Sequence, residues 1–410
     1  MEQFARKSGI LGVILVLICG CTQVRMISKF NSGRPVLGEE PSMVPFDLRE
    51  HAISVRVKVN DNPKEYDFVL DTGALTMIDE KIAKELNLER GAEMPTPDKT
   101  KKVYLTKGKV AISLGGARVE DFIVPIFDIS SSVGSAAAID GFIGSDFLRF
   151  FKVTIDYSKK TLFLSLNTDS SEPAHGAYTM KIDKPFPLRF PVVKCTIDGD
   201  VVAKGMIDTG CSYGLVIPLS FVERLPERSR RQLIRSKGLI AEWPFTKADH
   251  NYLTRIESLN VGTMEVRNIP AIFAELPSNR PDLLLGKDFL SQFLVTINYP
   301  KNEMTLVSHE TIRFKENIFS TGLALEEHEH GRIVVKGLWE GSPADRDGIQ
   351  PGDEILKVGS KSVRDVGYTE IKKILRDETI QDIELLVRTS DGEKSVVLRK
   401  EMLLPDVMEE

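Results

Sequence analysis

The chain has 410 residues, a formal net charge of −5, and 42% hydrophobic residues. This length suggests two or three domains, each long enough to bury a core of its own. Charges of both signs are interspersed and no extended block of lysine or arginine occurs, so nucleic acid is not expected as a partner.

The first twenty residues have the features of a secretory signal peptide. Arg6 and Lys7 supply positive charge, and the apolar run over residues 9–20 is too short to span a bilayer as a helix. The run ends in ICGC, which resembles the lipobox of bacterial lipoproteins. That resemblance implies cleavage before Cys21, lipid on Cys21 and, because Thr22 rather than Asp follows, a place on the periplasmic face of the outer membrane. The alternative is an ordinary signal peptide with an incidental cysteine.

The next segment, residues 21–48, contains three prolines and no sustained hydrophobic period, which predicts an extended tether. The alternating residues 53–59 then predict the first strand of a hairpin, whose second strand runs into FVLDTG. A second hairpin, further along the chain, runs into GMIDTG. A short helical stretch follows each DTG, over residues 79–88 and 218–234.

A second shared element shows that this region is duplicated. The sequence GSDFL begins at Gly144 and GKDFL begins at Gly286, an offset of 142, while the two DTG motifs are offset by 137. A nearly constant offset over separate motifs indicates two copies of one domain. We therefore predict two β-rich lobes, residues 49–166 and 181–310, joined by a linker.

The acids of the two DTG motifs, Asp71 and Asp208, occupy equivalent places in the two lobes. Two carboxyl groups that face each other at about 3 Å share one proton, because both cannot ionise. The ionised group can then activate a water molecule for attack on a peptide carbonyl, and the neutral group can hydrogen-bond the carbonyl oxygen. Neither a metal nor another cofactor is needed for this chemistry.

This pair of motifs resembles the aspartic peptidases, and especially their bacterial retropepsin-like branch. The resemblance covers about residues 50–308 and implies two pseudo-symmetric, pepsin-like lobes built as closed β-barrels. It also implies roles for individual residues: a catalytic pair, threonines that cross-link the two catalytic loops with glycines at their turns, and glycines of the loop that passes beside each acid strand. In that order these are Asp71 and Asp208; Thr72, Thr209, Gly73 and Gly210; Gly144 and Gly286.

Other polar residues of the lobes receive less specific interpretations. Asp146 and Asp288 are also repeated, and a helix cap or a brace for a loop is the better reading for them. Cys195 and Cys211 are expected to be small buried residues, although a disulfide between them remains an alternative in an oxidising envelope.

The flap that covers the cleft in aspartic peptidases is harder to place. Counted from each acid, the candidates are residues 95–106 and 236–251. Tyr104 and Trp243 are candidate substrate contacts, with ordinary packing as the alternative for each.

The last unit, residues 316–400, lacks the DTG pattern and contains GSPADRDGIQPGDEIL, which resembles PDZ domains. The resemblance implies that Gly322, Leu323, Ala324 and Leu325 form the loop that binds the terminal carboxylate of a peptide, which adds as a strand beside it. Residues 368–377 are predicted to form the helix on the other wall of the groove, and a hairpin is expected at Asp391-Gly392. The HEH run at residues 328–330 lacks a third ligand, so no metal site is predicted.

Together these observations predict a mainly β protein with two acid-protease lobes followed by a PDZ domain. The predicted function is a lipid-anchored envelope endopeptidase whose partners are polypeptide substrates, peptide C-termini and the membrane. The PDZ domain would capture C-termini or regulate access to the cleft. The alternative is a binding protein that holds peptides without cutting them. A site completed only in a dimer is a weaker possibility, because one chain supplies both acids.

Overall fold

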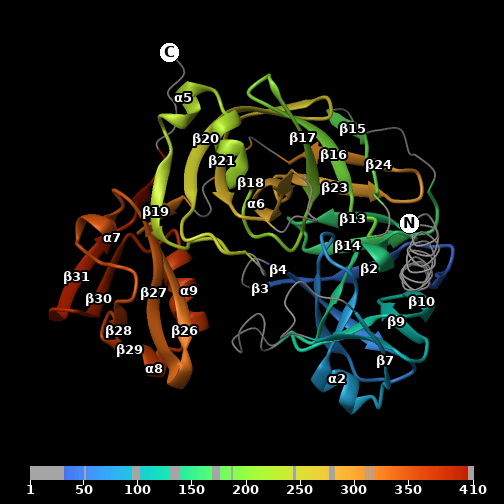
Figure 1. Ribbon diagram of the computed structural model, residues 1–410. Coiled ribbons are helices and arrows are strands. Elements are labelled where there is room, and N and C mark those ends of the chain that lie inside the picture. Colours follow the sequence, from blue (N-terminus) through green and yellow to red (C-terminus); the bar gives the residue numbers. More distant parts are fainter. Residues whose placement is uncertain are drawn as a thin grey trace, which may run out of the picture.

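The computed structural model describes residues 32–404 except 50–51, 95–101, 130–138, 169–175, 186–187, 243–245, 277–281, 310–311, 313 and 315–317. Two β-rich lobes lie one above the other in Figure 1, with the third unit beside them, and strands are the dominant element throughout. This confirms the predicted fold class, two acid-protease lobes followed by a PDZ domain. Among the described residues no helix is both long and apolar enough to cross a membrane.

The first lobe is an eleven-stranded sheet in which the acid strand β5 lies beside β12. β5 and β12 run parallel, with Phe68 opposite Gly141, while β12 and β6 run antiparallel. The elements of this lobe are β1 (Arg34–Val36), β3 (Asp47–Arg49), β4 (Ala52–Val59), β5 (Tyr66–Leu70), β6 (Met77–Asp79), α2 (Glu80–Glu85), β7 (Arg90–Met94), β8 (Val103–Thr106), β9 (Val110–Leu114), β10 (Ala117–Phe122), β11 (Pro125–Phe127), β12 (Gly141–Ile143) and α4 (Ser145–Leu148).

The second lobe repeats this arrangement. β17 and β22 run parallel, with Gly205 opposite Leu283, and β22 and β18 run antiparallel. Pro226 separates the two short helices that replace the single predicted one. The elements are β16 (Val192–Ile197), β17 (Val201–Ile207), β18 (Leu215–Pro218), η1 (Leu219–Arg224), α5 (Glu227–Arg230), β19 (Ile234–Gly238), β20 (Tyr252–Val261), β21 (Met264–Ala274), β22 (Leu283–Leu285) and α6 (Lys287–Leu290).

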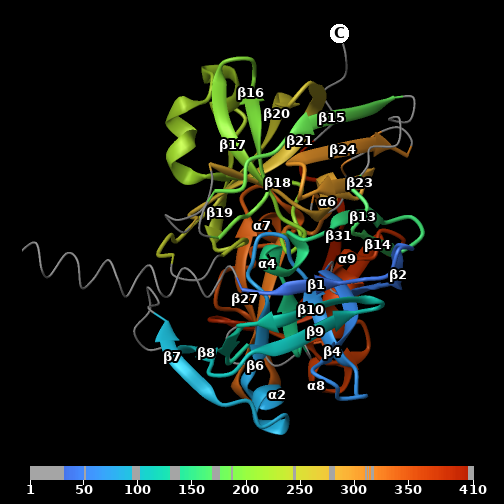
Figure 2. The same cartoon turned by 90° about the vertical axis from the view of Figure 1, so that its right-hand side faces the viewer.

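A six-stranded sheet joins the two lobes, and in Figure 2 it lies toward the viewer. At its centre β13 and β23 pair antiparallel, and Thr154 lies opposite Thr296 with their Oγ1 atoms 2.9 Å apart. These two threonines are equivalent positions of the two repeats, so the pseudo-twofold axis passes between them. The strands are β2 (Ser42–Pro45), β13 (Lys152–Asp156), β14 (Thr161–Ser165), β15 (Ala177–Lys181), β23 (Phe293–Asn298) and β24 (Glu303–Ser308).

The tether predicted over residues 21–48 needs correction in its second half. β1 pairs with β10, β2 pairs with β14 and β3 pairs with β4, so the chain enters the fold from residue 34. Val44 and Phe46 are buried in the core shared by both lobes. Three short strands separated by prolines and turns hide the two-residue period that a longer strand would show. Likewise, β15 lies inside the segment predicted as a linker. Cys21 and the signal lie outside the described residues.

The third unit has its own core and is joined to the second lobe by a strand pair. Its core consists of apolar side chains from β27, β28, β30, β31 and α9. β19 pairs with β27, so the sheet of the second lobe continues into the third unit (Figure 1). The elements are β25 (Phe319–Ser320), β26 (Leu323–His328), η2 (Glu329–Gly331), β27 (Arg332–Trp339), α7 (Pro343–Arg346), β28 (Glu354–Val358), β29 (Lys361–Ser362), α8 (Val363–Val366), α9 (Tyr368–Arg376), β30 (Asp382–Thr389), β31 (Gly392–Arg399) and β32 (Glu401–Met402).

Candidate active site

Each DTG acid follows directly after a buried strand. Asp71 follows β5 and its backbone N–H donates to the carbonyl of Ile143 at 2.9 Å. Asp208 follows β17 and donates in the same way to Leu285 at 2.9 Å. The strands that accept these bonds, β12 and β22, lead directly into Gly144 and Gly286. These are the glycines of the loop that was expected to pass beside each acid strand. The two repeats therefore position their acids with the same backbone hydrogen bond.

The two threonines lock the loops together across the interface between the lobes. Thr72 N donates to Thr209 Oγ1 at 3.0 Å, and Thr209 N donates to Thr72 Oγ1 at 3.1 Å. Each hydroxyl also donates across the interface, Thr72 Oγ1 to Ile207 O at 2.6 Å and Thr209 Oγ1 to Leu70 O at 2.8 Å. Both threonines are buried, so these four bonds are shielded from water.

Each glycine of the DTG motifs lies against the acid of the other lobe. Gly73 N donates to Asp71 Oδ1 at 2.8 Å, and a Cβ at Gly73 would lie 2.7 Å from Asp208 Oδ2. Gly210 N donates to Asp208 Oδ1 at 3.1 Å, and a Cβ there would lie 2.4 Å from Asp71 Oδ2. Each carboxyl group thus packs against the motif glycine of the other lobe, and only glycine leaves room for it.

The glycines that precede α4 and α6 are required by close backbone approach. A Cβ at Gly144 would lie 2.3 Å from the carbonyl oxygen of Ala74, and a Cβ at Gly286 would lie 2.1 Å from that of Tyr213. Neither glycine has a positive φ, so space rather than backbone strain selects this residue. Both predicted positions therefore lie against the catalytic loops.

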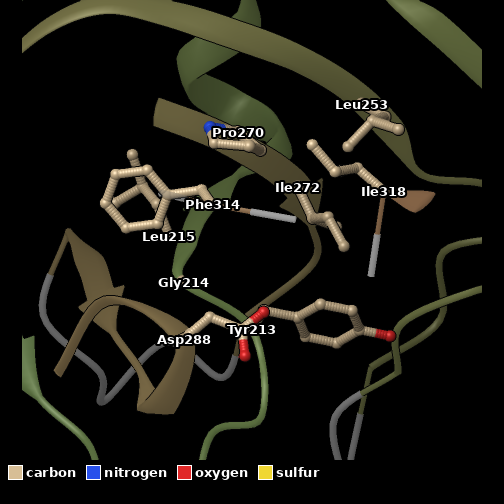
Figure 3. A pocket seen from close by; sticks show the side chains of 9 residues that line it. All are labelled: Tyr213, Gly214, Leu215, Leu253, Pro270, Ile272, Asp288, Phe314 and Ile318. Atoms are coloured by element: carbon tan, nitrogen blue, oxygen red, sulfur yellow. The ribbon is translucent and has the colours of Figure 1, made fainter. Parts of the chain in front are cut away.

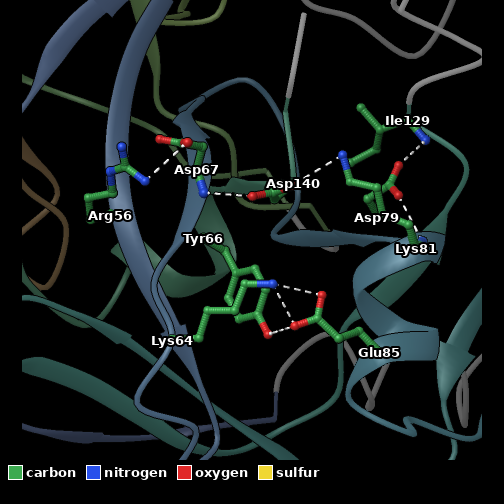
Figure 4. Close-up of polar contacts among 9 residues, drawn as sticks. All are labelled: Arg56, Lys64, Tyr66, Asp67, Asp79, Lys81, Glu85, Ile129 and Asp140. Atoms are coloured by element: carbon green, nitrogen blue, oxygen red, sulfur yellow. Dashed lines mark hydrogen bonds and ion pairs between the residues drawn. The ribbon is translucent and has the colours of Figure 1, made fainter.

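Polar contacts hold the strands around the first loop, as Figure 4 shows. Asp140 Oδ2 accepts from the backbone N–H of Asp67 at 2.9 Å, and Asp140 O accepts from Asp79 N at 2.9 Å. Asp79 Oδ1 accepts from Lys81 N at 2.8 Å at the start of α2, and Asp79 Oδ2 accepts from Ile129 N at 3.0 Å. These bonds connect β5, β6, β12 and α2 into one support for the acid loop.

Asp146 braces the first loop from below. Its Oδ1 accepts from the backbone N–H and the hydroxyl of Thr76, each at 2.7 Å, and from Phe147 N at 3.1 Å. Its Oδ2 is buried and has no hydrogen-bond partner among the described residues. Burial raises the pKa of the Asp146 carboxyl to about 6, against the bonds from Thr76 that favour the ionised form. This confirms a bracing geometry, although Gly144 rather than Asp146 is the cap of α4.

This raised pKa predicts a pH-dependent stability. Between about pH 4 and 6 folded Asp146 holds a proton that the unfolded chain has released, so its contribution to the free energy of unfolding falls as pH rises, by about 3 kcal/mol. Asp146→Asn keeps an acceptor for Thr76 and removes the titration. Urea unfolding at several pH values should give a flatter profile for the variant than for the wild type. Parallel profiles would contradict the prediction.

The two loops differ in ways that the repeat did not reveal. Ser145 donates a short hydrogen bond from its hydroxyl to the carbonyl of Thr72, whereas the equivalent residue of the second lobe is Lys287, which is buried with Nζ 3.5 Å from Asp288 Oδ1. The two DTG motifs are 137 residues apart, whereas the equivalent residues of β6 and β18, Met77 and Val216, are 139 residues apart. The loop between the DTG motif and the next strand is therefore two residues longer in the second lobe than in the first. The sequence signal for the first difference was the second residue of the repeated elements, which is serine in GSDFL and lysine in GKDFL.

The two cysteines are free thiols. Both are buried; burial raises the pKa of Cys195 to about 12, and burial, with the charge of Asp208 adding to it, raises the pKa of Cys211 well above its ordinary value. Thiols with raised pKa values are poor nucleophiles at neutral pH. Cys195 and Cys211 therefore act as small buried residues, the interpretation preferred from the sequence.

A small pocket opens next to the longer loop of the second lobe (Figure 3). Asp288 and Tyr213 lie on one side of it, and the remaining lining is apolar. The Tyr213 hydroxyl donates to Ile240 O at 3.3 Å. Phe314 and Ile318, from the segment that leads to the third unit, close the other side. The pocket thus belongs to the junction of the lobe with the third unit.

The flap candidates fall partly outside the described residues. In the first lobe β8 lies in the predicted segment and pairs with β7, which precedes it; Tyr104 lies on β8 with the guanidinium of Arg90 5.0 Å from the centre of its ring. Trp243 lies outside the described residues. In the second lobe the predicted segment begins in β19, which leaves β20 and pairs with β27. The packing interpretation of Tyr104 is therefore supported by a contact within its own hairpin.

In the third unit the four predicted loop residues lie at the start of β26. Gly322 has φ +87°, and a Cβ there would lie 2.2 Å from Ser342 Oγ. Its N–H already donates to Ser320 Oγ at 2.7 Å. Leu323, Ala324 and Leu325 follow in β26, opposite α9, and the predicted helix and final hairpin are both present. Within the described part of the chain no cluster of three potential metal ligands occurs, and His328 contacts Glu326 instead.

Two similar lobes, each supplying one carboxylate to a shared interface, define the class of bilobal acid-protease folds. Comparison with known families agrees. The aspartyl protease family model matches residues 55–147 and 193–289, and the PDZ domain model matches residues 311–388. The chain therefore has two lobes of the aspartyl protease family followed by a PDZ domain.

Curated relatives match a smaller part of the chain. A probable CtpA-like serine protease of Staphylococcus aureus strain bovine RF122 / ET3-1 is 31% identical over 175 residues, 42% of this chain and 35% of the relative. The protein of the same description from strain COL is 31% identical over 122 residues, 29% of this chain and 24% of the relative. The chain thus matches about a third or less of the length of these relatives.

Two seed globulins are among the solved structures to which the chain is similar. Basic 7S globulin from soybean has a TM-score of 0.39 and 10% identity, covering 66% of this chain and 95% of the globulin chain. Conglutin gamma from lupine seeds has a TM-score of 0.43 and 11% identity, covering 67% of this chain and 96% of its own.

Proposed function

We propose that this protein is an aspartic endopeptidase in which Asp71 and Asp208 activate one water molecule between them. The observation that carries the proposal is the reciprocal lock of Thr72 and Thr209, with Gly73 and Gly210 each placed against the carboxylate of the other lobe. Each acid therefore lies against the loop that carries the other, which supports a site shared by both. This arrangement requires glycine in both loops at positions where any side chain would clash, and a purely structural interface would not need that restriction.

The chemistry follows from the shared proton. One carboxylate takes a proton from water, and the hydroxide formed adds to the carbonyl carbon of the scissile peptide bond. The other carboxyl group donates its proton to the carbonyl oxygen. In the collapse of this tetrahedral intermediate, the carboxyl group that took the water proton passes it to the leaving nitrogen as the C–N bond breaks. The other carboxylate takes back a hydroxyl proton as the new carboxyl group forms, which restores the shared proton. The buried threonine bonds hold the acids in place while charge moves between them.

The name of the curated relatives raises serine catalysis as a second candidate. Both matches are partial, whereas the aspartyl protease family model matches the two segments that contain the DTG loops. We therefore assign the chemistry to the acids. Cleavage of an unfolded protein should be blocked by pepstatin, which carries a hydroxyl group in place of the attacked carbonyl. It should be unaffected by a sulfonyl fluoride, which sulfonylates a nucleophilic serine with loss of fluoride. The opposite result would transfer the activity to a serine nucleophile.

A binding protein that holds peptides without cutting them is the alternative function. An extended substrate would bind in both cases, so binding alone does not distinguish them. Hydrolysis by the coupled acid pair should give a bell-shaped dependence of rate on pH between about pH 3 and 7. A protein that binds unfolded polypeptide across this range without generating new N-termini would support the alternative.

We also propose that the PDZ domain binds peptide C-termini, and that lipid on Cys21 anchors the protein at the periplasmic face of the outer membrane. Among the described residues β26 pairs with β27 alone, and its other edge together with the apolar residues of α9 supports the first statement. The signal and its ICGC ending support the second. Mass spectrometry of the mature N-terminus tests the anchor, since an unmodified residue 21 would contradict it.

A further inference from the structure

The β19–β20 hairpin of the second lobe occupies the place that the β7–β8 hairpin occupies in the first. In the first lobe β8 pairs with β11, and β11 runs parallel to β6. In the second lobe β20 pairs with β21, and β21 runs parallel to β18. The equivalence of these strands makes β19 the counterpart of β7, the strand that leads into the predicted flap segment 95–106.

The two hairpins end differently. β7 is the last strand of its sheet in the described part of the chain. β19 pairs with β20 only at Ile234 and Arg235, and then pairs with β27 of the PDZ domain, with Ser236 opposite Trp339 and Gly238 opposite Gly337. One hairpin is therefore held by its own lobe, while the other is shared with the PDZ domain. We call the paired segments, residues 236–238 and 337–339, the seam.

The seam is tightly packed as well as hydrogen-bonded. A Cβ at Gly238 would lie 2.4 Å from the carbonyl oxygen of Lys336, and a Cβ at Gly337 would lie 2.7 Å from that of Leu239. Lys237 Nζ lies 2.5 Å from Asp345 Oδ1, and Glu340 N donates to Arg235 O at 2.9 Å. Such close contact allows little independent movement of the two strands.

The core beneath the seam reaches the acid loop. Trp339 is 3% exposed and belongs to an apolar cluster that also contains Met206 and Cys211. Met206 lies in β17, two residues before Asp208, and Cys211 follows the DTG motif. A displacement of Trp339 would therefore change the packing of the strand and the loop that carry the second acid.

The peptide groove of the PDZ domain lies on the other side of the same residues. β26 pairs with β27 through Leu323 opposite Leu338 and Ala324 opposite Gly337. Trp339 N donates to the carbonyl of Gly322, in the loop predicted to bind a carboxylate, at 3.1 Å. A peptide added to the other edge of β26 would thus be separated from β19 by two strands, β26 and β27, in one continuous sheet.

We propose that a peptide with a free C-terminal carboxylate, bound in the PDZ groove, activates the Asp71–Asp208 site through the seam. The inference rests on the proposed function. A strand added to β26 orders β26 and β27, and through the seam it orders the β19–β20 hairpin. The core beneath the seam, through Trp339, Met206 and Cys211, then holds the Asp208 loop more firmly, so substrate loses less conformational entropy when it binds there.

The test uses the full chain and two versions of one short peptide that ends in leucine, one with a free carboxylate and one amidated. The reporter is an internally cleaved peptide blocked at both ends, so that it offers no carboxylate to the PDZ groove. The free carboxylate should raise kcat/KM for the reporter by about fivefold or more, and the amide should not. A change below about twofold, or inhibition, would overturn the proposal.

Hydrogen exchange separates this proposal from the proposed function. In Asp71→Asn protein, the carboxylate peptide should slow exchange at residues 234–238, whereas the amide should not. Cleavage of the reporter without activation and without this protection means that the activity stands and the coupling fails. Protection without any cleavage by the wild type means that the coupling stands and the peptidase assignment fails.

Two glycines provide a matched pair of variants. Gly238 and Gly331 have nearly the same φ, +71° and +69°, but a Cβ at Gly331 has nothing within 4 Å. Gly238→Ala and Gly331→Ala therefore add the same backbone strain, and only the first opens the seam. Gly238→Ala should lose activation while Gly331→Ala keeps it. Gly337→Ala opens the seam from the PDZ side and should repeat the loss if Gly238→Ala fails to fold. Retained activation in a folded seam variant overturns the proposal.

Discussion

Asp71→Asn and Asp208→Asn should each reduce kcat/KM for peptide hydrolysis by about a thousandfold or more, while the protein remains folded. An amide cannot take a proton from water, and it cannot pass one to the carbonyl oxygen, so either substitution removes the shared proton on which the reaction depends. The rate is measured with a quenched fluorescent peptide, and folding with far-UV circular dichroism and thermal unfolding.

A matched control for these variants is Asp61→Asn, whose side chain is 95% exposed and lies outside the acid loops. It should retain wild-type activity. The two active-site variants combined should lose little more than either alone, because the acids act as one unit. Hydrolysis at the wild-type rate by the double variant would show that another group performs the reaction.

Thr72→Val should lower the free energy of unfolding by about 2–5 kcal/mol and also reduce activity. Valine has nearly the same shape, but it leaves the buried Ile207 carbonyl without its donor and the Thr209 N–H without its acceptor. Urea unfolding and kcat measure the two effects. Thr72→Ser keeps the hydroxyl and should recover most of both. Equal losses in the valine and serine variants would mean that the methyl group, not the hydrogen bonds, is what matters.

The repeated pattern of the sequence was sufficient to predict the lobes, the acid strands and the loops beside them. Each of these features is written twice, and the motifs include glycines whose replacement by any other residue would create a clash, as at Gly73 and Gly144. Local constraints of this kind are readable because one residue type alone satisfies them. The PDZ domain was predicted equally well, because its turns and the apolar face of α9 are local features of the sequence.

Features that depend on packing between distant segments were not predictable. Nothing in β1 or β2 indicates that they join sheets far along the chain, because each is too short for a period to appear. The pairing of β19 with β27 joins two domains, so no pattern inside either one signals it. Ser145 and Lys287 were overlooked for another reason: they fill the variable position of a repeated motif, where the repeat itself gives no guidance.

The last two described residues also pack on the second lobe. Leu403 and Leu404 are buried in the same cluster as Trp339, and the guanidinium of Arg255 donates to Leu404 O at 2.9 Å. Removing the last domain would thus strip a piece of the hydrophobic interior from the domain left behind, with aggregation as the expected result. Loss of proteolysis in such a truncated protein would report a damaged fold, and single substitutions are the sounder way to learn what this domain contributes.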